Sequence, residues 1–181
     1  MDKDVGRILD LLKELGIDEN TIVFFTSDNG AHGSGGTLDF FQASGLLRGK
    51  KRDLYEGGIR TPMIVKWSGK IKAGSESDFV GAFWDIMPTF AEITGTTTPK
   101  NIDGVSFLPT LLGEQQIQHD YLYWEFHMGK QQAVRLGSWK GIRFGGTKEP
   151  IELYDLDADI GEIHNVADGH PDIVARIAAI M

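Results

Sequence analysis

The stretch TIVFFTSDNGAHG, residues 21–33, begins as an apolar strand and ends in polar residues and glycine. Residues 21–26 are mostly β-branched or aromatic, a composition typical of a buried strand. Ser, Asp, Asn and Gly follow at its carboxyl end, at positions 27–30. These residue types form turns, but open α/β sheets also bind ligands at the carboxyl ends of their strands. From this stretch alone, a plain turn and a metal or anion site both stay open.

The segments around this strand predict a parallel sheet. Apolar residues recur at helical spacing in residues 5–15, and Gly16 can end that helix. Helix, short turn and apolar strand form half of a βαβ unit. A second apolar run, residues 61–67, predicts another strand. Because parallel sheets are buried on both faces and hold several strands, two strands cannot complete one. We expect the others to come from a larger domain or from a partner chain.

The pattern changes after about residue 115. Residues 120–127, 132–144 and 151–157 are rich in aromatic and β-branched residues and predict successive antiparallel strands. Residues 170–181 predict an amphipathic helix. The expected fold class is therefore α/β, in two regions. Residues 1–115 contribute the C-terminal part of a parallel-sheet domain, and residues 116–181 form a small antiparallel sheet with a C-terminal helix.

Composition excludes several classes of protein. The 181 residues are 41% hydrophobic and carry a formal net charge of −8, which argues against a general nucleic-acid binder. No stretch approaches the roughly 20 apolar residues of a membrane span. The sequence contains no cysteine. Disulfides, thiolate metal ligands and a cysteine nucleophile within this chain are therefore excluded.

Two stretches could carry chemistry. Asp28 and Asn29 offer hard oxygen ligands of the kind that calcium and magnesium prefer. Calcium takes roughly 6–8 oxygens, so other ligands must come from elsewhere. Residues 46–62, LLRGKKRDLYEGGIRTP, concentrate five cationic side chains in an otherwise acidic chain. A lysine there can bind a tetrahedral oxyanion as a point charge, although a solvated basic loop is the alternative.

Five stretches in this order resemble the sulfatase family: TSDNG, LRGKKRDLYEGGIRTPMIVKW, GKIKAGSESD, DIMPTFAEITG and ELYDLDADIGEIHNVA. The resemblance covers nearly the whole chain. It implies an alkaline-phosphatase-like fold and hydrolysis of sulfuric esters. It also implies a divalent cation, usually Ca²⁺ with Mg²⁺ possible, and a sulfated small molecule or sulfated carbohydrate as substrate.

The resemblance also assigns expected roles to individual residues. Asp28 and Asn29 match two ligands of the cation. Lys51 lies four residues before the tyrosine of Y-E-G-G and matches the active-site lysine, which is expected to hold a sulfate oxygen; Lys50 is the adjacent alternative. His32 is a candidate substrate contact or a loop cap. His127 is a candidate substrate contact or an ordinary strand-end histidine.

One part of the family pattern is missing from this sequence. Sulfatases attack with a formylglycine made from the first residue of a C/S-x-P-x-R motif, and the nearest arrangement here, SFLPT, does not fit it. We therefore expect a C-terminal portion that is inactive alone and needs a missing N-terminal part. Many relatives are exported to the periplasm or out of the cell, but the location of this chain stays unknown.

Two other functions remain as alternatives. Phosphonate and phosphodiester hydrolases of the same superfamily resemble sulfatases in nucleophile and metal site. A non-catalytic protein that binds sulfated glycans is the alternative from a different class. The acidic balance of the chain argues against general polyanion binding.

Overall fold

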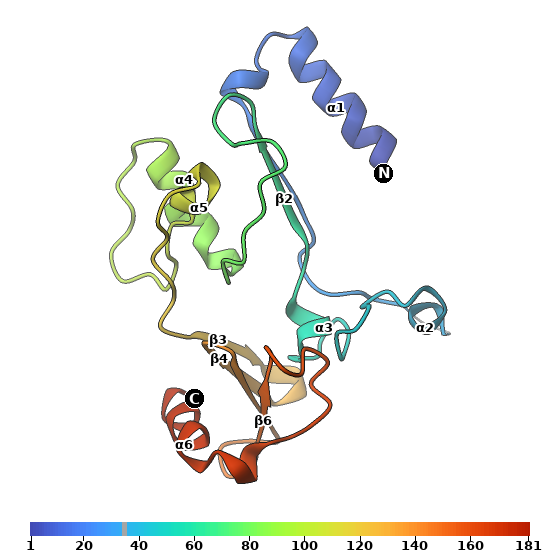
Figure 1. Cartoon of the computed structure of the whole chain (residues 1–181), viewed down its shortest axis with the longest axis vertical. Coiled ribbons are helices and arrows are strands. Elements are labelled where there is room, and N and C mark those ends of the chain that lie inside the picture. The colour runs from blue at the N-terminus through green and yellow to red at the C-terminus, as the bar shows by residue number, and fades with distance from the viewer. Residues whose placement is uncertain (34–35) are drawn as a thin grey trace. The chain divides into compact units, whose positions relative to one another are not determined.

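The computed structural model of the chain describes residues 1–33 and 36–181 (Figure 1). The chain forms two compact units. The first, here the ribbon unit, comprises residues 1–26 and 63–119; the second, here the sheet unit, comprises residues 27–62 and 120–181. The glycine-rich segment 27–62 thus belongs with the C-terminal sheet. The predicted domain boundary after residue 115 stays a prediction.

The ribbon unit contains the two strands predicted from the apolar runs. Helix α1, Asp2–Glu14, and a 3-10 turn, Asp18–Asn20, precede β1, Ile22–Thr26. Strand β2, Met63–Trp67, pairs with β1 in antiparallel register. The prediction that these strands run parallel is therefore wrong. The chain leaves β1 and enters β2 at the same end of the ribbon, whereas a parallel pair needs a crossover from one end to the other.

The remainder of the ribbon unit is built around a buried aspartate. A 3-10 turn, Phe83–Asp85, leads into α4, Ile86–Ile93, and α5 spans Leu108–Leu112. The Asp85 carboxylate accepts hydrogen bonds from two backbone amides and lies 3.0 Å from His119 Nε2. These contacts attach the segment after α4 to the start of the helix.

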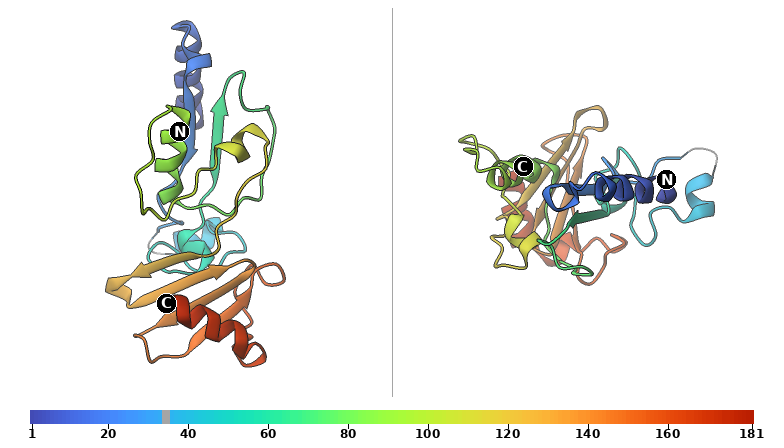
Figure 2. Two further views of the ribbon diagram at one scale, coloured as in Figure 1. Left: turned by 90° about the vertical axis from the view of Figure 1, so that its left-hand side faces the viewer. Right: turned by 90° about the horizontal axis from the view of Figure 1, so that it is seen from above.

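The sheet unit holds four antiparallel strands in the order β3-β4-β5-β6. A 3-10 turn, η3, follows β3, and another, η4, precedes helix α6. Helix α6, drawn in red, lies beside the sheet (Figure 2). Fully buried Val134, Leu153 and Ile177 pack together between α6 and one face of the sheet. The predicted antiparallel sheet with a C-terminal helix is thus confirmed. The bounds are β3 Leu122–Phe126, η3 His127–Gly129, β4 Gln131–Leu136, β5 Trp139–Phe144, β6 Ile151–Asp155, η4 Ala167–Gly169 and α6 Pro171–Ile180.

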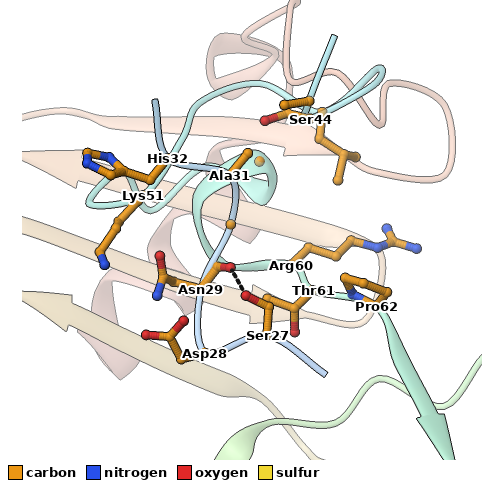
Figure 3. Close-up of a pocket in the computed structure, with 14 residues that line it drawn as sticks. Ser27, Asp28, Asn29, Ala31, His32, Ser44, Lys51, Arg60, Thr61 and Pro62 are labelled. Carbon is orange, nitrogen blue, oxygen red and sulfur yellow. Dashed lines mark hydrogen bonds between the residues drawn. The ribbon is translucent and has the colours of Figure 1, made fainter. Parts of the chain in front are cut away.

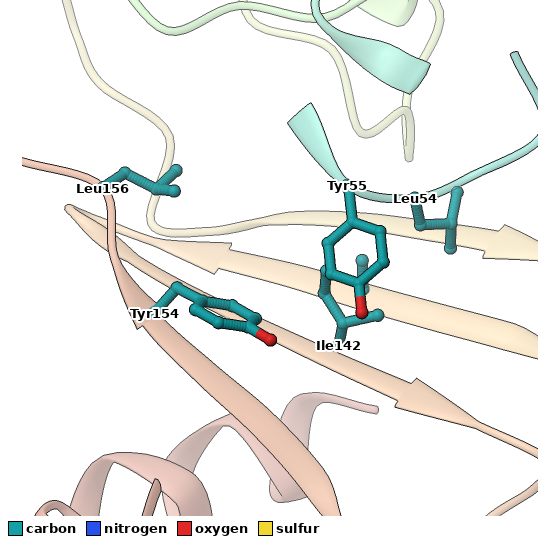
Figure 4. Close-up of a cluster of buried hydrophobic side chains, with 6 residues drawn as sticks. Leu54, Tyr55, Ile142, Tyr154 and Leu156 are labelled. Atoms are coloured by element: carbon teal, nitrogen blue, oxygen red, sulfur yellow. The ribbon is translucent and has the colours of Figure 1, made fainter. Parts of the chain in front are cut away.

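The other face of this sheet is covered by part of the glycine-rich segment. That segment contains two short helices that the sequence pattern did not predict, α2, Thr37–Phe41, and α3, Glu56–Ile59. Tyr55 packs with Ile142 and Tyr154 of the sheet in a buried apolar cluster (Figure 4). The sheet is therefore sandwiched between α6 and the segment that carries the Y-E-G-G motif.

Across the part of the chain that the structure describes, no helix combines the length and the apolar character needed to span a bilayer.

Candidate active site

The sheet unit contains a cavity of about 700 Å³ between the loop that follows β1 and residues 43–62. It brings together Asp28, Asn29, His32 and Lys51, four of the five residues singled out from the sequence (Figure 3). His127 begins η3 and is absent from the described residues that line this cavity. Its predicted contact with substrate stays a prediction.

Three glycines allow the backbone segments around this cavity to pack closely. The Gly30 amide donates to the Gly58 carbonyl over 2.8 Å, and a Cβ on Gly30 would lie 1.9 Å from the Gly57 carbonyl oxygen. A Cβ on Gly57 would lie 2.4 Å from the Arg48 carbonyl oxygen. No side chain fits in such spaces. The two loops can therefore pack together only if the D-N-G and E-G-G motifs both keep their glycines. The glycines let two loops that are distant in sequence form one wall.

The backbone also fixes the position of Lys51. Its amide donates to the Ala31 carbonyl over 2.9 Å, so Lys51 lies directly against the loop that carries Asp28 and Asn29. In Figure 3 its side chain extends toward these two residues. Lys50 does not appear among the described residues of the cavity wall. The geometry therefore favours Lys51 over its neighbour as the cation of this cavity.

Asp28 and Asn29 fit one part of a cation site. Carboxylate and amide oxygens suit Ca²⁺ or Mg²⁺, and both side chains face the cavity beside Lys51 (Figure 3). In the described part of the chain, no three His, Cys, Asp or Glu side chains form a metal-binding group. Because Ca²⁺ takes roughly 6–8 oxygens, these two residues can hold only one side of such an ion.

Arg60 is a second cation in the cavity wall, and the sequence motifs did not assign it a role. It lines the cavity, and its Nη1 lies 3.8 Å from Glu56 Oε2. Its side chain is about half exposed, with 52% of its surface accessible, so the ion pair contributes little to stability. Proximity to the glycines of E-G-G was the available sequence signal for Arg60.

A buried ionic group lies under the E-G-G turn. Lys140 of β5 donates to Glu56 Oε1 over 2.7 Å, and its Nζ lies 3.8 Å from Glu162 Oε1. The Glu56 amide donates to Glu162 Oε2 over 2.7 Å, and Arg135 of β4 lies 3.6 Å from Glu56 Oε2. Burial raises the pKa of Glu162 to about 7, against the opposing effect of Lys140. Sequence reasoning did not single out Lys140 or Glu162.

An aromatic arrangement reinforces this attachment. The Arg48 guanidinium lies 3.9 Å from the centre of the Tyr55 ring and donates to the Tyr154 hydroxyl. Both tyrosine hydroxyls donate to Glu152 Oε2, over 2.6 and 2.7 Å. Burial, together with these bonds to Glu152, raises the pKa of Tyr55 above its ordinary range and that of Tyr154 to about 12. Both tyrosines therefore remain protonated donors near neutral pH.

Comparison with known proteins places this cavity in a family. A family described as Sulfatase matches residues 1–96, and one described as N-sulphoglucosamine sulphohydrolase, C-terminal, matches residues 49–179. The N-acetylgalactosamine-6-O-sulfatase of Bacteroides thetaiotaomicron is 30% identical over 204 aligned positions, which cover all of this chain and 39% of the relative. The N-acetylgalactosamine-6-sulfatase of Mus musculus is 39% identical over 142 positions, which cover 77% of this chain and 27% of the relative.

Solved structures agree with these matches. A Bacteroides thetaiotaomicron protein from a study of the metabolism of multiple glycosaminoglycans superposes with a TM-score of 0.85 at 29% identity, over 99% of this chain and 42% of its own. A protein in complex with its substrate D-glucosamine-2-N,6-O-disulfate has a TM-score of 0.76 at 26% identity, over 99% and 37%. The phosphonate monoester hydrolase of Agrobacterium radiobacter, at 24% identity and a TM-score of 0.70 over 97% and 37%, shares the fold.

The fold and the matches place the chain in the alkaline-phosphatase-like superfamily. The chain belongs to the sulfatase family and corresponds to its C-terminal portion. It spans 39% of the length of one of these relatives and 27% of the other.

Proposed function

We propose that this chain forms the C-terminal part of a sulfuric ester hydrolase and contributes Lys51, Asp28 and Asn29 to its active site. The observation that supports this proposal most directly is that these three side chains line one cavity, next to the glycine contacts of D-N-G and E-G-G. The formylglycine nucleophile and the remaining cation ligands would come from sequence outside these 181 residues, because no C/S-x-P-x-R motif is present here.

In this proposal each residue has a defined task. Lys51 donates hydrogen bonds to a sulfate oxygen and offsets the negative charge that develops as the ester bond breaks. Asp28 and Asn29 hold one side of a Ca²⁺ ion, which orients and polarises the sulfate group when bound. Arg60, in the same wall, adds positive potential that favours entry of an anionic substrate.

The proposed substrate class is a sulfated carbohydrate. Two relatives are named for 6-sulfated amino sugars, and one similar structure is described with a disulfated glucosamine as its substrate. A cavity of about 700 Å³ is large enough for one sugar ring.

The test compares substitutions of two neighbouring lysines, made in the full-length protein that the gene encodes. Lys51→Ala should lower kcat/KM for a nitrophenyl sulfate by about 10²–10³-fold, the effect of removing one preorganised oxyanion partner. Lys50→Ala, the matched control, should lower it by less than about threefold, in line with loss of an exposed charge. Chelation should remove activity, and added Ca²⁺ should restore it.

Three outcomes would count against this proposal. Equal losses in the two lysine variants would remove Lys51 from the site. Faster hydrolysis of a nitrophenyl phosphonate than of the sulfate would favour the phosphonate hydrolase alternative. Binding of sulfated glycans without any turnover would favour a non-catalytic binding protein.

A further inference from the structure

Glu162 is a buried acidic side chain that contacts the first residue of the E-G-G turn, and the proposed chemistry does not use it. Its side chain is fully buried, and its backbone adopts φ = 52°, a left-handed conformation that is uncommon for residues other than glycine. Within the described part of the chain, its Oε1 is the buried side-chain oxygen without a hydrogen-bond partner. Burial of a carboxylate, a strained backbone conformation and an oxygen without a hydrogen-bond partner each destabilise the fold, so the surrounding structure must hold this residue in place.

Glu162 and Lys140 hold Glu56 by its backbone and by its side chain. Glu162 Oε2 accepts the Glu56 amide over 2.7 Å, while Lys140 Nζ donates to Glu56 Oε1 over 2.7 Å. Glu56 is itself only 3% exposed. One bond from β5 and one from the loop between β6 and η4 thus fix the first residue of α3 in both position and direction.

The two residues that follow Glu56 connect it by hydrogen bonds to the loops that line the cavity. The Gly57 amide donates to the Arg48 carbonyl over 2.7 Å, and the Gly58 carbonyl accepts the Gly30 amide over 2.8 Å. Gly30 directly follows the proposed cation ligands. Any shift of α3 therefore moves the loop with Asp28 and Asn29 as well as the turn that leads to Lys51, because the close glycine contacts leave no free space.

We propose that Lys140 and Glu162 are positioning residues, which clamp Glu56 and thereby set the separation between Lys51 and the Asp28–Asn29 pair. The expected effect on activity rests on the proposed function. The expected effect on the position of the loops does not depend on it. A buried ion pair adds little net stability compared with apolar side chains of similar volume. Catalytic groups, in contrast, must be held within about 0.5 Å of their working geometry.

The clamp is tested by amide hydrogen exchange in the protein as its gene encodes it. Glu162→Leu removes the acceptor for the Glu56 amide, and Lys140→Met removes the donor to its side chain at similar volume. Both should speed exchange by at least about tenfold in peptides covering residues 27–33 and 48–58, the signature of easier local opening. Glu162→Gln keeps an acceptor oxygen and should retain most of the protection.

Two further readouts separate positioning from a general loss of stability. Lys148→Met, which alters an exposed lysine of the same sheet unit, should leave exchange and activity unchanged. Lys140→Met should lower kcat by about 10–100-fold with a smaller change in KM, as expected when partners of a site lose their orientation. If Glu162→Leu fails to fold, Lys140→Met and Glu162→Gln still distinguish a positioning role from a general loss of stability.

The outcomes distinguish this inference from the proposed function. If the peptides of residues 27–33 and 48–58 keep wild-type exchange in Lys140→Met, or if protection falls equally across β4, β5 and β6, the positioning role is overturned. If the wild-type protein lacks sulfatase activity but the two peptides respond as expected, the proposed function fails and the clamp stands.

Discussion

The two units of this chain differ in how their strands are buried. In the ribbon unit, the fully described elements α1, β1 and β2 contain no buried side chain, and Ile64 of β2 is 63% exposed. In the sheet unit, Val134, Ile142 and Leu153 are 0% exposed, because both faces of the sheet are covered. Apolar strands with exposed faces need further partners, whereas a sheet covered on both faces is complete.

The candidate site belongs to only one of these two units. The cavity, its three glycine contacts and the ionic group under it all belong to the sheet unit. The ribbon unit supplies the strands whose ends lead into that segment. The C-terminal sheet of this sulfatase portion therefore supports one wall of the proposed active site.

The largest expected difference between the two units is in core substitutions. Leu153→Ala should lower the free energy of unfolding by about 2–5 kcal/mol, because it opens a cavity against α6. Ile64→Ala, its control in β2, should change stability by less than about 0.5 kcal/mol, since the side chain is mostly exposed. Denaturant unfolding of this chain, followed by circular dichroism, measures both. Equal losses would mean that the ribbon is as well packed as the sheet.

A second difference concerns pH. The pKa of Glu162 is raised from 4.5 to about 7, so the folded chain binds this proton more tightly than the unfolded chain. The resulting stabilisation is fully present below pH 4.5 and is lost as the pH rises through about 7. Across this window it amounts to at most about 3 kcal/mol.

Glu162→Gln is the matched variant for this prediction. Its free energy of unfolding should lack the fall that the wild-type chain shows between about pH 4.5 and 7, while other carboxylates titrate equally in both proteins. Denaturant titrations at several pH values measure the difference. Identical pH profiles in the two proteins would show that Glu162 ionises without cost inside the fold.

The smallest expected effects come from two glycines that have opposite surroundings. Gly30→Ala should destabilise the sheet unit by about 1–3 kcal/mol, because its Cβ would overlap the Gly57 carbonyl. Gly6→Ala in α1 should stabilise that helix by roughly 0.5–1 kcal/mol, because a Cβ there meets no atom within 4 Å. Thermal unfolding measures both changes. A neutral Gly30→Ala would show that the loops are not closely packed.

Local patterns predicted much of the fold but not its pairing. Helical spacing and a capping glycine located α1, and aromatic, β-branched runs located β3 and β6. Residues 132–144, predicted as one strand, instead form β4 and β5, because the chain turns at Gly137, where φ is 62°. The direction of β2 relative to β1 was missed because residues 27–62 return to the same end of the ribbon, which no local pattern records. Helices α2 and α3 were missed because they are only five and four residues long.

Some residues of the candidate site could be predicted from the sequence, and others could not. Asp28, Asn29 and Lys51 were found because short motifs carry them, and the structure brings them into one cavity. Lys140 and Glu162 lie 84 and 106 residues from Glu56, and neither stands in a pattern that signals burial. A buried lysine in an alternating strand resembles an exposed one in sequence, so its partner is visible only in the folded chain.

The most direct test of the central claim is anomalous diffraction from crystals of the gene-encoded protein grown with Ca²⁺ and sulfate. We expect a calcium peak at about 2.3–2.6 Å from oxygens of Asp28 and Asn29. We also expect a sulfate bound by the ammonium group of Lys51 in the same cavity. Calcium and sulfate bound elsewhere, with this cavity holding only water, would contradict the assignment of the site.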